Sequence, residues 1–352
     1  MSFGSSTAPV HVVYVGGFGR SGSTLLERIL GAIPGWANVG ELVDLPRSVW
    51  PQDELCGCGE RFSACPLWLE VGEIAFGGWS EDTMNHLADL RIGVARQRHL
   101  PALLALASGR ARASHLAQVR DYQQAYGRIY QAVAQASGAS VVVDASKGPA
   151  HGLALAAAPD PSFVTDRGYG MSMVNLVRDP RGVAYSWSRR TGSRPQAGAT
   201  NTEMWTISPT RSAAQWAALQ TEMQLVARPI ESHRVRYEDL VAHPRATVRG
   251  LLERLGLAAV DGGLDHLEEH AVTLTSSHGL SGNPSRFRNG RIDLELDEQW
   301  ARDLPAGERR TVTALTLPWL TAYGYDVRPR PSASTSGNPQ GSGAAQRTEH
   351  PS

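Results

Sequence analysis

Residues 16–24 read GGFGRSGST (Gly16 to Thr24), and this stretch decides the fold because of what stands on either side of it. The run HVVYVG (11–16) before it is almost continuously apolar, which predicts a strand buried on both faces of a parallel sheet. The segment TLLERILGAI (24–33) after it places apolar residues at helical spacing. A strand, a glycine-rich turn and a helix in this order predict a loop that holds an anion on backbone N–H groups and a helix N-terminus.

The loop differs at one position from the triphosphate-binding pattern G-x-x-x-x-G-K-[ST]. Gly17 and Gly22 have the required spacing, but the next two residues are Ser23 and Thr24, and the nearby cation is Arg20. Without a lysine at position 23, and without an evident acidic strand end for magnesium, the loop is poorly suited to a nucleoside triphosphate. We expect a less charged phosphate that is held by Arg20 and hydroxyl groups.

Composition excludes several classes of partner. The chain has 352 residues and balances 34 basic against 34 acidic side chains, so we expect no nucleic-acid partner. No apolar run is long enough to span a bilayer, and the N-terminus lacks the regions of a signal peptide, which predicts a cytoplasmic protein.

We expect a flexible segment 1–10, a single domain over 11–328 and a disordered tail over 329–352, which is rich in Ser, Gly and Pro.

Strands and helices alternate along the domain. Further strands are predicted at SVVVDAS (140–146), MVNLVRD (173–179) and the more polar HRVRYEDL (233–240). Helices are predicted over 245–257 and over 81–137, the latter with breaks near Pro101 and Gly109. This order predicts an α/β fold, a three-layer sandwich with a central, mostly parallel sheet flanked by helices. Residues 45–138 form a largely helical insertion that we expect to shape a substrate site.

All three cysteines lie in one short segment, LCGCGERFSACPLW, as Cys56, Cys58 and Cys65. Three thiols are one ligand short of a four-cysteine zinc site, and the first two are closer than the usual two-residue gap. We expect reduced structural cysteines, with a zinc site that borrows a histidine, or a redox role, as the alternatives.

The segment GGFGRSGSTLL, followed by GEL (40–42), resembles the 5′-phosphosulfate loop of sulfotransferases that use 3′-phosphoadenosine 5′-phosphosulfate (PAPS). Arginine at position 20 and the downstream Gly-Glu are similar to the tyrosylprotein sulfotransferases and related bacterial enzymes, whereas the cytosolic small-molecule enzymes usually carry lysine in the place of Arg20. The resemblance implies a P-loop-like fold, PAPS as the sulfate donor and a hydroxyl group as the acceptor. It extends in patches between residues 12 and 300.

The resemblance also implies which residues bind the donor. The loop would contribute Arg20, Ser21, Gly22, Ser23 and Thr24, and NLVRDPRGVAYSWSRR would contribute Arg178 and Ser186 to the 3′-phosphate. Local rules agree with the second assignment, because Asp179 can cap a helix that starts at Pro180. Further implied contacts are Tyr237 beside the adenine and, in SGNPSRFRNG, Arg286, Arg288 and Gly290.

Sulfuryl transfer, like phosphoryl transfer, is an in-line displacement that depends on positioning and electrostatics. Because the sulfuryl group carries less charge than a phosphoryl group, cationic side chains can replace a metal ion, and we expect no metal to be required. Glu41 is the predicted base for the acceptor hydroxyl, Arg20 and Lys147 are the predicted cations at the leaving oxygen, and Ser277 is a further predicted hydrogen-bond donor. Ser276 and Ser281 compete with Ser277, while His151 and His278 stand in no recognisable base context.

Two other readings of the sequence stay open. One is a P-loop kinase or NTPase with an atypical loop, for which Asp144 is the obvious magnesium ligand. The other is a nucleotide-binding protein without turnover. The acceptor is expected to be a small alcohol or phenol, and neither its identity nor the oligomeric state follows from the sequence.

Overall fold

The computed structural model describes residues 9–110, 112–189, 206–257 and 262–328. The tail 329–352 and residues 1–8 of the predicted flexible N-terminus lie outside these ranges.

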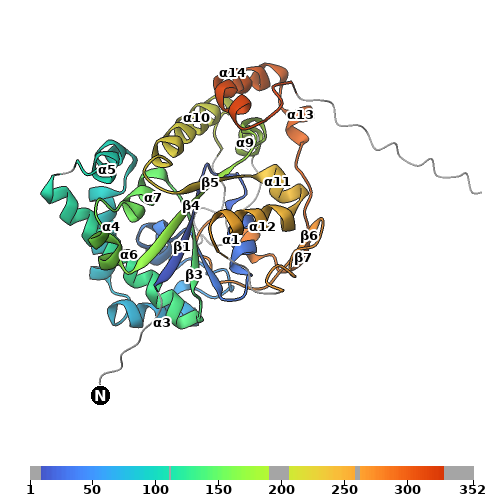
Figure 1. Cartoon of the computed structure of the whole chain (residues 1–352). Helices are drawn as coiled ribbons and strands as arrows, with labels where there is room; N and C mark the ends of the chain where they lie inside the picture. The colour runs from blue at the N-terminus through green and yellow to red at the C-terminus, as the bar shows by residue number, and fades with distance from the viewer. Residues whose placement is uncertain (1–8, 111, 190–205, 258–261, 329–352) are drawn as a thin grey trace, which may run out of the picture.

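A five-stranded parallel sheet forms the centre of the molecule (Figure 1). Its order is β2-β3-β1-β4-β5, and all four neighbouring pairs are parallel. The strands are β1 (Val10–Gly17), β2 (Trp36–Gly40), β3 (Val141–Lys147), β4 (Tyr169–Val177) and β5 (Ser232–Arg236). The sheet confirms the predicted α/β fold. The four strands expected from the sequence are present, but the expected strand 233–240 ends at Arg236, and residues 237–240 belong to helix α11 (Tyr237–Ala242). Strand β2 was not expected.

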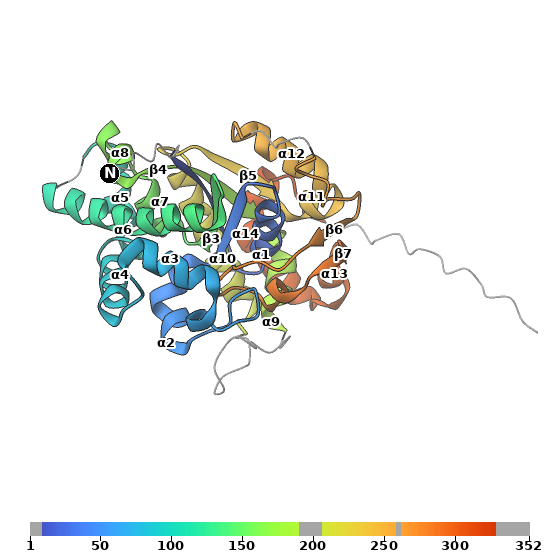
Figure 2. The same ribbon diagram turned by 90° about the horizontal axis from the view of Figure 1, so that it is seen from below.

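Both faces of the sheet are covered because alternate side chains of each strand point to opposite sides. Val12 and Tyr14 of β1 belong to one apolar core, whereas Val13 and Val15 belong to another on the opposite face. Figure 2 shows the helices that cover each face. The first core contains residues of α3 (Pro66–Phe76), α4 (Glu81–Val94), α5 (Leu100–Ala107), α6 (Ala113–Ser137), α7 (Pro149–Ala156) and α8 (Pro161–Arg167); the second contains residues of α1 (Ser23–Gly31), α11 (Tyr237–Ala242) and α12 (Pro244–Arg254).

The predicted helical region 81–137 becomes three helices. Pro101 lies in the first turn of α5, where its missing N–H costs nothing, and α5 ends just before Gly109, whose φ is +70°. The long α6 follows and buries its tyrosines against α7 and β4. The expected helical insertion is therefore a set of separate helices stacked on one face of the sheet, beginning with the short α2 (Trp50–Gln52).

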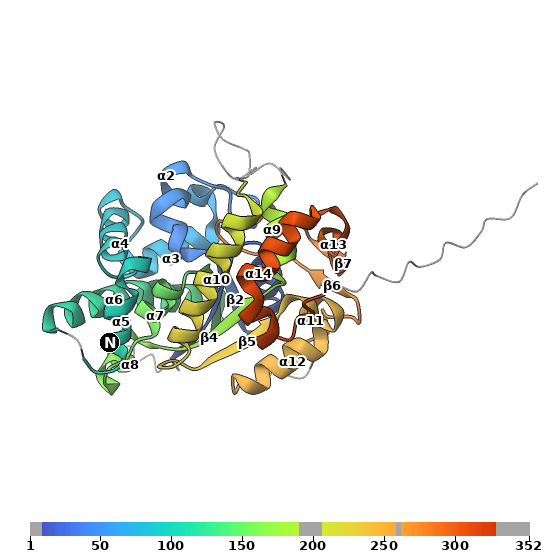
Figure 3. The same ribbon diagram turned by 90° about the horizontal axis from the view of Figure 1, so that it is seen from above.

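The C-terminal part adds a further helical group and a hairpin. In Figure 3, α14 (Ala306–Ala322) lies beside α10 (Pro209–Val226), and α9 (Pro180–Ser188) packs against both, with α13 (Gln299–Asp303) next to α9. Strands β6 (Ala271–Leu274) and β7 (Gly290–Asp293) form an antiparallel pair, and the chain between them runs past the end of β2. Within the described ranges, no helix combines the length and the apolar character that a bilayer span requires.

Candidate active site

The carboxyl ends of all five parallel strands meet along one edge of the sheet, where α/β proteins usually bind their ligands. Each end delivers one polar group. In sheet order from β2 to β5, the groups are Glu41, Lys147, Arg20 on the loop after β1, Arg178 and Tyr237. These residues are far apart in the sequence, and the order of the strands alone brings them into one row.

The loop after β1 has the backbone of an anion cradle. Gly22 has a φ of +92°, and a Cβ atom there would lie 2.5 Å from a ring carbon of Tyr237, so only glycine fits. Gly22 is also the N-cap of α1 and offers no side-chain cap, which leaves the first N–H groups of the helix available to a ligand. Ser23 and Thr24 occupy the first turn of α1 and line the pocket.

Arg20 and Arg178 approach each other across this loop. Arg178 donates from Nη1 to the carbonyl oxygen of Arg20 at 3.1 Å, and its guanidinium stacks 4.7 Å from the ring centroid of Tyr237. Arg20 lies over the ring of Trp187 at 5.1 Å. Burial and the charge of Arg178 lower the pKa of Arg20 below its ordinary value. Two cations held so close together form a site that a multiply charged anion would stabilise.

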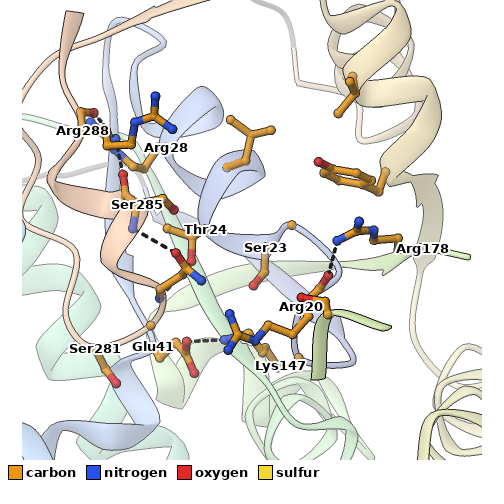
Figure 4. Close-up of a pocket in the computed structure, with 18 of the residues that line it drawn as sticks. Arg20, Ser23, Thr24, Arg28, Glu41, Lys147, Arg178, Ser281, Ser285 and Arg288 are labelled. Atoms are coloured by element: carbon orange, nitrogen blue, oxygen red, sulfur yellow. Dashed lines mark hydrogen bonds and ion pairs between the residues drawn. The ribbon is translucent and has the colours of Figure 1, made fainter. Parts of the chain in front are cut away.

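Glu41 and Lys147 form an ion pair at another end of the pocket (Figure 4). Each side chain is less than one-fifth exposed. The backbone N–H of Glu41 donates to Leu280 at 2.8 Å, and a Cβ on Gly282 would lie 2.9 Å from Oε1 of Glu41. The segment after β6 therefore closes over the carboxylate and fixes its position.

These groups surround one pocket of about 560 Å³. Figure 4 shows Glu41 and Lys147, the pair Arg28 and Arg288, and Arg178 on different sides of it, with Ser23 and Thr24 on the helix between them. The predicted site residues that line the pocket are Arg20, Gly22, Ser23, Thr24, Glu41, Lys147, Arg178, Ser186, Tyr237 and Arg288. From the insertion 45–138, Arg47 is the residue in the wall.

Four other predicted site residues are outside the wall that the described residues form: Ser21, Ser277, Arg286 and Gly290. Ser21 is a buried residue of the loop, and Gly290 begins β7. The hydroxyl of Ser277 accepts from Nδ2 of Asn38 at 3.5 Å, whereas its competitor Ser281 lines the pocket and donates to Asp44 at 2.8 Å.

Arg286 is only 1% exposed and serves the fold. Its guanidinium donates to the carbonyl oxygens of Ser281 and, at 2.7 Å, Leu55. Arg286 thus ties the chain after β6 to the segment that carries the cysteines, while Arg288, two residues on, faces the pocket.

Sequence reasoning missed two residues of α1, Arg28 and Glu27. Arg28 follows Thr24 by four residues, so both lie on one face of the helix; it lines the pocket and donates to the carbonyl oxygens of Thr275 at 2.9 Å and Ser285 at 3.2 Å. Glu27 is 2% exposed and its Oε2 has no hydrogen-bond partner among the described residues. Burial raises the pKa of Glu27 to about 8, against the opposing effect of Lys147.

The residues that could support a different reaction, Asp144, His151 and His278, lie outside the pocket. Asp144, the candidate magnesium ligand, is fully buried and accepts hydrogen bonds from Tyr130 at 2.6 Å and from the Ser146 amide at 2.8 Å. His151 is buried against Tyr122, and burial lowers its pKa to about 3. His278 lies beside the cysteines.

The chain resembles one family of known proteins. The model of the sulfotransferase family matches residues 12–261, which is most of the chain. No curated protein matches the chain. The sulfotransferase domain of the Synechococcus PCC 7002 olefin synthase is 19% identical with a TM-score of 0.46, and the alignment covers 92% of this chain and 97% of that one. The sulfotransferase domain from the curacin biosynthetic pathway is 19% identical (TM-score 0.41, 91% and 99% covered), and sulfotransferase STF9 from Mycobacterium avium is 13% identical (TM-score 0.45, 92% and 79% covered).

Proposed function

Because the chain belongs to the sulfotransferase family, we propose that it transfers the sulfuryl group of PAPS to the hydroxyl group of a small alcohol or phenol. One observation carries the proposal. A single pocket of about 560 Å³ contains a phosphate loop with Arg20 and two further cations at the ends of the neighbouring strands, Lys147 after β3 and Arg178 after β4. A nucleotide with phosphates at both its 3′ and 5′ positions matches such an arrangement.

The donor would bind along the row of strand ends. Its 5′-phosphosulfate would accept from the backbone N–H groups of residues 22–24 at the start of α1, with Arg20 as the nearest side-chain cation. Its 3′-phosphate would accept from Arg178 and from the hydroxyl of Ser186, both of which line the pocket. Tyr237, already stacked on Arg178, would then lie beside the adenine.

Glu41 would act as the base. In the proposed reaction the acceptor oxygen forms a bond to sulfur, the bond from sulfur to the 5′-phosphate oxygen breaks, and the proton of the acceptor passes to Glu41. Lys147 holds the Glu41 carboxylate by their ion pair and would stabilise the charge that develops on the departing phosphate, together with Arg20. Adenosine 3′,5′-bisphosphate leaves.

No metal is needed for this balance of charge. Asp144, the magnesium ligand that a kinase reading would use, is committed to Tyr130 and Ser146. In the proposed mechanism, Arg20 and Lys147 stabilise the charge that develops on the departing phosphate.

A thermal-shift experiment tests the proposal. Adenosine 3′,5′-bisphosphate at one hundred times its dissociation constant should stabilise the protein by about 2.7 kcal/mol. ATP with Mg²⁺ at the same concentration should stabilise it less. A mass-spectrometric screen with PAPS and metabolite extracts would then identify the acceptor. Stabilisation by ATP–Mg²⁺ alone, or transfer of phosphate from ATP, would refute the proposal and favour a kinase.

A further inference from the structure

The three cysteines of the chain meet His278, which lies more than two hundred residues further along the sequence. Cys65 Sγ is 3.6 Å from Cys56 Sγ and 3.7 Å from Cys58 Sγ. Nδ1 of His278 lies 3.2 Å from Cys65 Sγ and 3.8 Å from Cys56 Sγ. All four potential ligand atoms lie within 4.8 Å of one another, and none of the four residues lines the pocket.

We propose that Cys56, Cys58, Cys65 and His278 bind one Zn²⁺ ion, which has a structural role. A tetrahedral zinc ion with ordinary bond lengths separates its sulfur ligands by about 3.8 Å and a sulfur from a nitrogen ligand by about 3.5 Å. The measured separations of 3.6 and 3.7 Å, and of 3.2 and 3.8 Å, are close to these edges before any ion is added. Three sulfurs and one nitrogen complete the coordination shell, and a closed shell of this kind is typical of structural rather than catalytic zinc.

Zinc binds cysteines as thiolates, so the ion would take the place of the thiol protons in this cluster. Cys56 and Cys65 are buried, and Cys58 is half-buried. A site of three thiolates and one neutral imidazole has a net charge of −1 with Zn²⁺, and the buried guanidinium of Arg286 lies near it, because it donates to Leu55, the residue before Cys56.

The two halves of the cluster are held together by contacts that require particular residues. A Cβ on Gly57 would lie 2.7 Å from the carbonyl oxygen of Ser277, so the Cys-Gly-Cys turn can approach the second segment only with glycine between the cysteines. The Gly57 amide donates to Gly279 at 3.0 Å, and the Trp68 indole donates to His278 at 2.9 Å. The backbone thus presents His278 to the thiols.

The ion would fix one wall of the active site. Two residues after His278, Leu280 accepts from the Glu41 amide, and the next residue, Ser281, lines the pocket. Zinc would therefore couple the cysteine segment to the part of the chain that closes over Glu41. This role does not depend on the identity of the sulfate donor, so zinc binding and the proposed function can fail separately.

A disulfide does not account for the same geometry. A bonded pair would be about 2.0 Å apart, well below the observed sulfur separations. One disulfide would also leave the third cysteine without a partner, because the chain has only 3. A disulfide would also not explain why Nδ1 of His278 lies 3.2 Å from the sulfur of Cys65, which both other thiols approach.

Elemental analysis of the purified full-length protein, without a metal-binding tag, tests the proposal. We expect about one zinc per chain, and, after exchange to Co²⁺, the visible spectrum of tetrahedral cobalt with a thiolate charge-transfer band. Since all cysteines of the chain lie in this cluster, that band can arise nowhere else. Wild-type protein that contains less than about one-tenth of a zinc per chain and gives no such cobalt spectrum would overturn the proposal.

Variants locate the site. His278→Ala and Cys65→Ser should lower zinc retention against a competing chelator by at least about tenfold, as expected for the loss of one ligand. His86→Ala removes an exposed histidine on α4 and should retain zinc like the wild type. Equal zinc retention by His278→Ala and His86→Ala, or a thiol count of one instead of three in the unreduced wild type, would contradict the proposal.

Discussion

Glu27 provides a direct test of the electrostatics beneath the pocket. Its carboxyl group is buried in α1, and Lys147 and Glu41 both act on it electrostatically. Burial raises its pKa from 4.5 to about 8. Between these two values the folded protein holds a proton on Glu27 that the unfolded chain has already released, so the stability that this group contributes falls as the pH rises. The contribution is complete below pH 4.5 and is lost as the pH passes 8.

The size of the effect follows from this pKa. One proton difference changes the free energy of unfolding by about 1.4 kcal/mol per pH unit, so the wild type loses about 2.7 kcal/mol from this group between about pH 5.5 and about pH 7.5. Glu27→Gln has a similar shape and no titration. The variant should therefore gain about 2–3 kcal/mol relative to the wild type over those two units, whatever the offset between the two proteins at the lower pH.

Urea unfolding followed by tryptophan fluorescence measures this difference at each pH. Groups that titrate alike in both proteins cancel in the comparison. Glu73→Gln is the matched control, because Glu73 is an exposed glutamate on α3, and its curve should run parallel to that of the wild type. If the Glu27→Gln curve also runs parallel to the wild type, Glu27 is ionised in the folded protein and the reasoning is wrong.

Three further predictions concern the pocket. Arg178→Ala should weaken the binding of adenosine 3′,5′-bisphosphate by about 10- to 150-fold, because one charge-assisted hydrogen bond is lost. The binding of adenosine 5′-monophosphate, measured by the same calorimetry, should be almost unaffected. Equal losses of affinity for both ligands would argue against a 3′-phosphate site. Glu41→Gln should lower kcat for sulfuryl transfer by about 10²- to 10⁴-fold with little change in bisphosphate affinity, and an unchanged kcat would exclude Glu41 as the base. Gly22→Ala should cost about 1–3 kcal/mol in urea unfolding, because its Cβ would meet the Tyr237 ring at a φ of +92°, whereas Gly307→Ala, with open space around it, should cost nothing; similar losses would contradict the cradle geometry.

The parts of the fold that the sequence predicted are those whose signal is local. β1, β3 and β4 are largely buried on both faces, and each contains an apolar run that can be recognised in the sequence. β2 is only five residues long, WANVG, and contains a polar residue and a glycine. Its strand conformation depends on pairing with β3, which lies about a hundred residues later, so no window of the sequence could reveal it.

For the candidate site too, local sequence signals identify single residues but not their arrangement in space. Glu41, Lys147 and Arg178 could each be singled out because each stands at or just after the end of a strand or beside a recognisable motif. Their arrangement in one row required the sheet order β2-β3-β1-β4-β5, which the sequence does not state. Glu27 has no motif at all, and its raised pKa arises from burial that only the tertiary structure provides.

Arg286 and Arg288 show how a distant segment decides a local choice. Arg286 lies in the short 3-10 helix Pro284–Phe287, whereas Arg288 follows it in an extended conformation, so the two side chains leave the chain in different surroundings. Arg286 takes the buried position because the carbonyl oxygens of Ser281 and Leu55 are there to accept from it, and Leu55 belongs to the segment that continues into Cys56. Arg288 is left to face the pocket. The position of a cation in the active site thus depends on a segment more than two hundred residues away, which is held against this chain at the cysteine and histidine cluster; a metal ion bound there would stabilise the cluster and, with it, the orientation of Arg288.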